Sequence, residues 1–130
     1  MSGKGNSTDD PHEWLVRARS SLHLAEMDAP GILFEDLCYQ AQQAAEKAVK
    51  TIFISRNIAY PYIHNINTLL TILEMEGVII PERIWLISKL TVYAIGTRYP
   101  GFEPVTKQEY SEAVRFAKEA VAWAEEMIGE

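Results

Sequence analysis

Two adjacent residues, Arg98 and Tyr99, have side chains suited to binding an anion. They follow an apolar helical segment and precede Pro100 and Gly101, which end that helix. A guanidinium binds a phosphate through two parallel hydrogen bonds, and a phenol stacks on a nucleobase or donates to a phosphate oxygen. Arg98 is equally suited to pairing with carbonyls at the helix end, with Tyr99 packing the corner. The pair is therefore either a phosphate site or a helix cap.

Two further candidates, His64 and Lys50, add a proton-transfer group and a second cation. His64 stands just before a helical segment, so either it or Asn65 would cap that helix. Alternatively, its imidazole faces the same cleft as Arg98 and transfers protons near neutral pH. Lys50 follows Glu46 at a four-residue spacing that favours their interaction on a helix. It is the other cation that we expect at a phosphate.

Other kinds of site are not expected. His12 and His23 form no ligand pair at helical spacing, and the single cysteine, Cys38, has no second thiol for a disulfide or a zinc site. We expect both histidines at or near the surface and Cys38 in the core. The chain has no glycine-rich phosphate loop and no nucleophile elbow. We therefore expect neither a metal nor a cofactor.

Composition indicates one soluble domain with a local rather than a general affinity for anions. The chain has 130 residues, of which 48% are hydrophobic and 23% charged, and a formal net charge of −6. This charge argues against broad wrapping of nucleic acid but permits a local basic pocket. Residues 1–9 have no apolar signal core, and we expect a flexible tail there, with the domain at 10–130. A cytoplasmic location is the simplest interpretation.

Five helical segments and no strands are expected. Capping signals mark two of the starts, at Asp10 with Pro11 and Glu13, and at Thr106 with Glu109. The expected helices run from Asp10 to just before Ala29, from about Leu33 to Arg56, from Ile66 to Gly77, from Pro81 to about Ala94, and from Thr106 to the end. Their short connections predict an all-α, up-and-down bundle of four to five helices.

The alanine-rich stretch "QAQQAAEKAVK" (residues 40–50) permits two interpretations. Small residues let helices approach closely, whereas the long polar ones need solvent or partners. The second helix is therefore either the tightly packed centre of one bundle or a surface that faces a second copy, where glutamines pair across a two-fold axis.

Three stretches together resemble one known family. "CYQAQQAAEKAVKTIF" (residues 38–53), "HNINTLLTIL" (64–73) and "TRYPG" (97–101) occur in the order and at about the spacing of the prokaryotic HEPN family. The resemblance extends roughly from residue 11 to 128. It implies a helical bundle that dimerises, often encoded beside a minimal nucleotidyltransferase in a toxin–antitoxin-like module. Many members are metal-independent endoribonucleases, and some bind nucleotides.

The resemblance also supplies an expected catalytic pair, which is incomplete here. In the ribonucleases an arginine is followed about four to six residues later by a histidine; the first offsets phosphorane charge and the second transfers protons. Arg98 matches the arginine, but residues 102–105 contain no histidine. Glu103 is a poor replacement because an exposed carboxylate is a weak base and repels phosphate.

We therefore expect a homodimeric domain that binds a nucleotide or RNA phosphate through Arg98, Tyr99, His64 and Lys50, and that acts with a minimal nucleotidyltransferase partner. One alternative is a metal-independent endoribonuclease in which folding brings His64 to Arg98. The other is a structural scaffold without a ligand, in which Arg98 binds only groups of its own chain.

Overall fold

The described part of the chain is entirely helical. The computed structural model describes residues 10–94 and 103–130, and no strand occurs among them. The elements are α1 (Pro11–Ala25), α2 (Phe34–Ser55), α3 (Ile66–Met75), α4 (Glu82–Trp85), the 3-10 helix η2 (Leu86–Tyr93) and α5 (Lys107–Ile128). The expected all-α helical bundle is confirmed. Residues 1–9, Arg98 and Tyr99 lie outside the described ranges.

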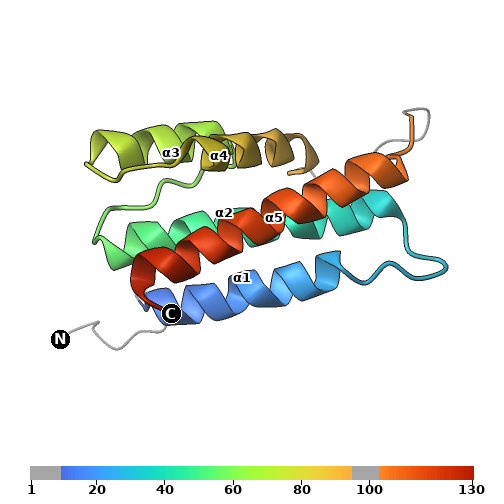
Figure 1. The fold of residues 1–130 in the computed structure, drawn as a ribbon, viewed down its shortest axis with the longest axis horizontal. Helices are drawn as coiled ribbons and strands as arrows, with labels where there is room; N and C mark the ends of the chain where they lie inside the picture. Colours follow the sequence, from blue (N-terminus) through green and yellow to red (C-terminus); the bar gives the residue numbers. More distant parts are fainter. Residues whose placement is uncertain (1–9, 95–102) are drawn as a thin grey trace.

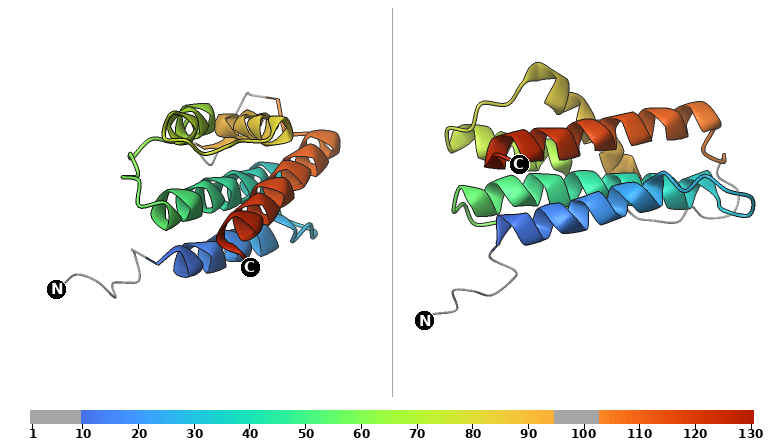
Figure 2. Two further views of the ribbon diagram at one scale, coloured as in Figure 1. Left: turned by 60° about the vertical axis from the view of Figure 1, so that its left-hand side comes forward. Right: turned by 60° about the horizontal axis from the view of Figure 1, so that its bottom comes forward.

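Helix α2 is the centre of the bundle. Its main neighbours are α1 on one side and α5 on another, while α3 and the α4–η2 segment lie together as a further layer (Figures 1 and 2). α1 and α2 form an antiparallel pair joined at one end of the molecule (Figure 1). An extended segment, residues 56–65, leads from the end of α2 to α3.

Alanines make this central position possible. Eight alanines on α2 and α5 are almost completely buried within the single chain, so that the two helix backbones approach closely. The buried alanines of these two helices are Ala41, Ala44, Ala45, Ala48, Ala113, Ala117, Ala120 and Ala124. Burial inside one chain accounts for the small residues of α2. It leaves the expected homodimer untested.

The helix ends follow their capping residues. Thr106 and Glu109 form the expected reciprocal capping box at α5, and the Asp10 carboxylate accepts from the His12 amide at 2.9 Å. The expected reciprocal partner at α1, Glu13, instead lies 3.3 Å from Arg17. At α3 the cap is Asn65, whose Oδ1 accepts from the Thr68 amide at 3.1 Å, and this leaves the His64 imidazole for other contacts.

Helix α1 ends earlier than its pattern predicts, at Ala25. The Ala25 carbonyl, one of those left without an intrahelical partner, accepts a hydrogen bond from the Tyr110 hydroxyl of α5 at 2.6 Å. The Tyr110 ring stacks on Phe34 at the start of α2, with centroids 5.0 Å apart. The end of α1 is thus held against both α5 and the start of α2.

The expected fourth helix is mostly a 3-10 helix. One α-helical turn, α4, continues directly into the eight residues of η2. The buried residues Ile84, Ile87 and Leu90 recur every third position, with the partly buried Tyr93 next in the series. Since a 3-10 helix has three residues per turn, this spacing keeps all four on one face, which an α-helix of 3.6 residues per turn would not do.

The end of η2 is held beside the start of α3. The Thr91 hydroxyl accepts a hydrogen bond from the Ile66 amide at 3.1 Å, and this amide belongs to the first residue of α3. A first-turn amide has no partner within its own helix, so Thr91 satisfies it. The contact places the end of η2 beside Ile66, which follows His64 by two residues in the sequence.

Candidate functional site

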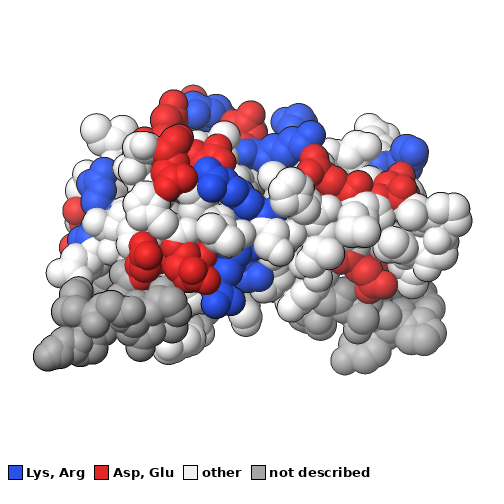
Figure 3. Space-filling model, turned by 90° about the horizontal axis from the view of Figure 1, so that it is seen from below, with Lys and Arg blue, Asp and Glu red and all other residues white. Residues whose placement is uncertain are grey.

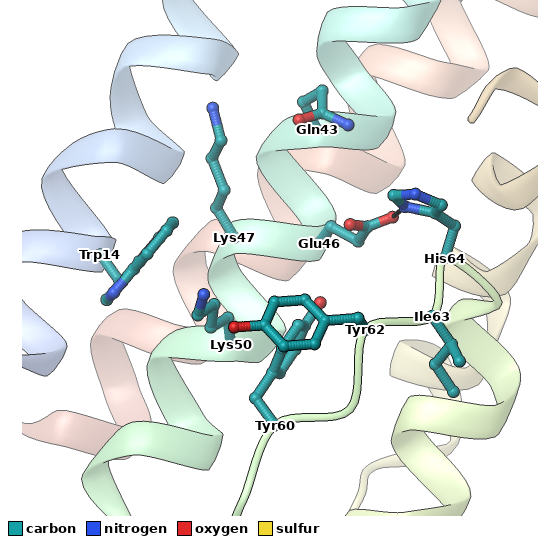
Figure 4. Close-up of a pocket in the computed structure, with 9 residues that line it drawn as sticks. All are labelled: Trp14, Gln43, Glu46, Lys47, Lys50, Tyr60, Tyr62, Ile63 and His64. Carbon is teal, nitrogen blue, oxygen red and sulfur yellow. Dashed lines mark hydrogen bonds and ion pairs between the residues drawn. The ribbon is translucent and has the colours of Figure 1, made fainter. Parts of the chain in front are cut away.

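A cavity of about 280 Å³ opens between α1, α2 and the 56–65 segment. Figure 4 shows that the three segments contribute aromatic, cationic and amide side chains to one space. The lining residues are Trp14 of α1; Gln43, Glu46, Lys47 and Lys50 of α2; and Tyr60, Tyr62, Ile63 and His64 of the connecting segment. Two of the predicted site residues, Lys50 and His64, therefore line the same cavity.

The connecting segment reaches this cavity because it folds back along α2. The Tyr60 ring packs edge-on against Phe53 with centroids 5.2 Å apart, and His64 contacts Glu46, about two turns earlier in the helix. The connecting segment therefore runs back along α2 from Phe53 toward Glu46. On α2 the lining residues recur at three- and four-residue spacings, which places them on one face of the helix.

Lys50 lies between two aromatic rings. Its Nζ is 3.8 Å from the ring centroid of Trp14 and 4.9 Å from that of Tyr60. A second cation, Arg17, has its guanidinium carbon 5.4 Å from the same Trp14 ring. Aromatic faces attract cations, so the rings stabilise two positive charges close together. Burial raises the pKa of the Tyr60 phenol, with a smaller contribution from the Glu46 charge, so this ring stays neutral.

Lys47 adds a third cation. Its Nζ donates to the Ser21 hydroxyl of α1 at 2.8 Å. The pKa values of both Lys47 and Lys50 are lowered, first by burial and then by the charge of Arg17, while Glu46 acts in the opposite direction. Arg17 is paired with Glu13, so Lys47 and Lys50 are left with Glu46 as the carboxylate that lines the same cavity.

That carboxylate, Glu46, is buried and is bound within its own chain. Its Oε2 lies 2.8 Å from Nδ1 of His64 and accepts a short hydrogen bond from the Gln42 amide. Gln42, which is fully buried, in turn accepts from Gln43 at 2.9 Å. The buried glutamine of α2 thus finds its partners inside one chain. The His64 side chain remains 67% exposed and borders the cavity.

The other residues singled out from the sequence lie elsewhere. Arg98 and Tyr99 are outside the described ranges. His12 and His23 are exposed, with His12 contacting Glu130, and Cys38 is buried, all as expected. Over residues 10–94 and 103–130, no three His, Cys, Asp or Glu side chains are placed to share a metal ion.

Sequence reasoning missed Trp14, Lys47, Tyr60 and Tyr62. Trp14 stands at an apolar position of the α1 pattern, is only partly buried and borders the cavity. The tyrosines belong to "AYPYIHN", whose two aromatic residues around a proline were the available signal.

Within residues 10–94 and 103–130, no helix is both long and apolar enough to span a bilayer.

The comparisons with known proteins agree with this fold. The sequence profile of the HEPN domain matches residues 11–127, most of the chain. The chain belongs to the HEPN domain family. Among curated proteins no relative matches it.

Two solved structures extend the likeness of this HEPN domain. The crystal structure of TT1696 from Thermus thermophilus is 34% identical, with a TM-score of 0.78, and the match covers 90% of this chain and 97% of that one. ST0689, an archaeal HEPN homologue, is 23% identical, with a TM-score of 0.72 and coverage of 92% and 98%. The second match shows the shared fold.

Replacing Glu46 by alanine is expected to destabilise the domain by about 1–3 kcal/mol, because the buried Gln42 amide would lose its acceptor. Urea unfolding followed by circular dichroism measures this difference. Glu112→Ala, which removes an exposed carboxylate paired with Arg115, is the matched control and should change stability little. Equal midpoints for the two variants would contradict the role assigned to Glu46.

Proposed function

We propose that this HEPN domain binds a nucleotide or an RNA phosphate in the cavity lined by Trp14, Lys47, Lys50 and His64. The observation that carries the proposal is the position of Lys47 and Lys50 in the wall of one aromatic-lined cavity, in a chain of net charge −6. An anion is the ligand that pairs with two such cations.

The physical argument rests on charge and on ring faces. Burial and, second, the charge of Arg17 lower the pKa values of Lys47 and Lys50, so their protonated forms are less favoured than in water. A bound phosphate would supply a counter-charge and hydrogen-bond acceptors for both ammonium groups. The exposed Tyr62 ring offers a face on which a base can stack, an interaction tolerant of base identity.

Arg98 and Tyr99 belong to this proposal as further phosphate-binding residues. The support comes from η2, whose Thr91 is bonded to the first amide of α3. The chain that leads toward Arg98 therefore departs from the neighbourhood of the segment that carries His64. A guanidinium arriving from that side would complete a bidentate phosphate contact.

A nucleotide is expected to raise the melting temperature of the unmutated protein, because a ligand that binds only the folded state stabilises it by about 1.4 kcal/mol at ten times its Kd. Lys50→Gln and Arg98→Ala should remove most of this rise, and Lys89→Gln, a lysine distant from the cavity, should keep it. A thermal melt with adenine nucleotides at millimolar concentration makes the comparison. No rise in any variant would refute the proposal.

A second candidate function, metal-independent RNA cleavage, is favoured by the contact between Glu46 and His64. A carboxylate on Nδ1 orients the imidazole and leaves Nε2 as the nitrogen that exchanges protons at the cavity. Here His64 would replace the histidine that is absent after Arg98, and the guanidinium would offset charge on the phosphorane.

For this second function, labelled RNA incubated in chelator should be cleaved by the unmutated protein, and His64→Ala should slow cleavage about 10²–10⁴-fold. Arg98→Ala should also abolish it, whereas Lys89→Gln should cleave at the normal rate. If the unmutated protein leaves RNA intact but is still stabilised by nucleotides, RNA cleavage would be refuted and nucleotide binding would stand.

The proposal includes a homodimer and a minimal nucleotidyltransferase partner, for which family membership is the main support. The outer face of α1 adds a physical one, since its exposed residues Val16 and Leu24 border a shallow hollow together with Met27, which follows the helix. Burying such a stripe against a second copy removes apolar surface from water.

We expect Leu24→Glu to convert a dimer of the unmutated chain into a monomer, because a charge would be buried at the contact. Light scattering measures the mass. Lys89→Gln should remain dimeric. A monomeric unmutated chain would refute the proposed dimer.

The proposed partner needs its own test, which is co-purification with the product of a neighbouring nucleotidyltransferase reading frame.

A further inference from the structure

We infer that the cavity selects a terminal phosphate, the phosphomonoester of a single nucleotide, over the bridging phosphodiesters of an RNA strand. The inference rests on the proposed function and narrows it. It follows from the charge, the shape and the surroundings of the cavity.

The charge of the site matches a dianion. The side chains of Lys47 and Lys50 stand three residues apart on one face of α2, whereas the Arg17 guanidinium beside Trp14 is paired with Glu13. A phosphomonoester carries about −1.5 to −2 charges at pH 7 because its second pKa is about 6. A phosphodiester carries a single negative charge under all these conditions. Only the monoester therefore brings enough charge to pair with both lysines.

The carboxylate of the site favours a compact anion. Glu46 lies on the wall beside Lys47 and Lys50, and its oxygen is already occupied by His64 and Gln42. It cannot bind a phosphate, and it repels one that approaches that wall. A single terminal group at the two lysines avoids it, whereas the successive phosphates of a strand would bring further negative charge close to Glu46 or to Glu13 of α1.

The shape of the site also fits one nucleotide. At about 280 Å³ the cavity is near the lower end of the usual range for small-ligand pockets, roughly 300–1,000 Å³. It is bordered by α1, α2 and the connecting segment, whereas a nucleic-acid strand needs a basic groove along which its backbone continues. On the face shown in Figure 3, basic side chains gather in the middle and acidic side chains flank them on both sides.

A place for the base lies at the mouth of the cavity. Tyr62 is 95% exposed and borders the same space as Lys50, so its ring has a free face for stacking. Figure 4 shows this ring in front of the cavity, with Trp14 on the opposite wall. A phosphate at Lys47 and Lys50 and a base on Tyr62 account for both halves of one nucleotide.

Three adenine ligands separate the two kinds of phosphate. AMP has a terminal monoester, 3′,5′-cyclic AMP has one internal diester, and the dinucleotide ApA without a terminal phosphate has one bridging diester. We expect AMP to bind at least about tenfold more tightly than the other two at neutral pH, a difference of one decade in Kd. Titration calorimetry, together with the fluorescence of Trp14, measures the binding.

Variants test the origin of this preference. Lys47→Gln should reduce the affinity for AMP about tenfold and affect cyclic AMP less, which a merely structural role of the lysine would not do. Lys89→Gln is the matched control and should retain the preference. Trp14→Phe should remove the fluorescence change while AMP still binds, because Trp85 and Trp123 do not line the cavity.

The preference should also depend on pH. Below about pH 6 the monoester becomes a monoanion, so the ratio of AMP to cyclic AMP affinity should fall toward one. The ionisable groups around the site are Glu13 and Arg17 of α1; Glu46, Lys47 and Lys50 of α2; and Tyr60, Tyr62 and His64 of the connecting segment. Because histidines titrate in this pH range, the series is repeated in His64→Gln, where the ratio should fall in the same way.

The outcomes separate the inference from the proposed function. Suppose that the unmutated protein binds all three ligands equally and that Lys47→Gln and Lys50→Gln lose this binding. The selection of a terminal phosphate would then be overturned, while phosphate binding at the two lysines would stand. Absence of binding by all three would overturn both. A preference for AMP that survives unchanged at low pH would also overturn the inference, since charge would not be its cause.

Discussion

The return of the 56–65 segment along α2 is the constraint on which the rest of the site depends. The contacts that hold it there include the packing of Tyr60 against Phe53 and the hydrogen bond between His64 and the buried Glu46. Without them α2 would present Lys47 and Lys50 on an open helix surface, where water screens charge and ring faces have nothing to enclose. With them, one helix face becomes the floor of a cavity.

The same helix serves two opposite demands along its length. One side is a row of alanines that lets α5 and α1 approach the backbone, and this close packing anchors the floor of the cavity. The other side carries long polar residues, among which Glu46 and Gln42 are buried and satisfied by each other and by His64. Rigid packing on one side thus positions cations on the other, where a mobile helix would let them separate.

Much of this arrangement is readable from the sequence, and the reasons differ from residue to residue. The caps Asp10 and Thr106 act locally, so short-range pattern suffices to predict them. Lys50 and His64 were singled out by chemical type and both line the cavity, but their meeting depends on the path of a connection that has no periodicity. Trp14 was not singled out because a residue at an apolar helical position borders a cavity only when a neighbouring segment builds the opposite wall. The 3-10 geometry of η2 was missed because a spacing of three residues also occurs within one turn of an α-helix, and only its repetition to Tyr93 distinguishes the two.

The unusual form of η2 has a mechanical consequence for the helix that precedes it. A 3-10 helix rises about 2.0 Å per residue and an α-helix about 1.5 Å, so rewinding the eight residues of η2 would shorten it by about 4 Å. With the Thr91 hydroxyl bonded to the first amide of α3, such rewinding would move the other end of η2, and α4 with it, relative to α3. The winding of η2 therefore fixes where α4 stands along the bundle.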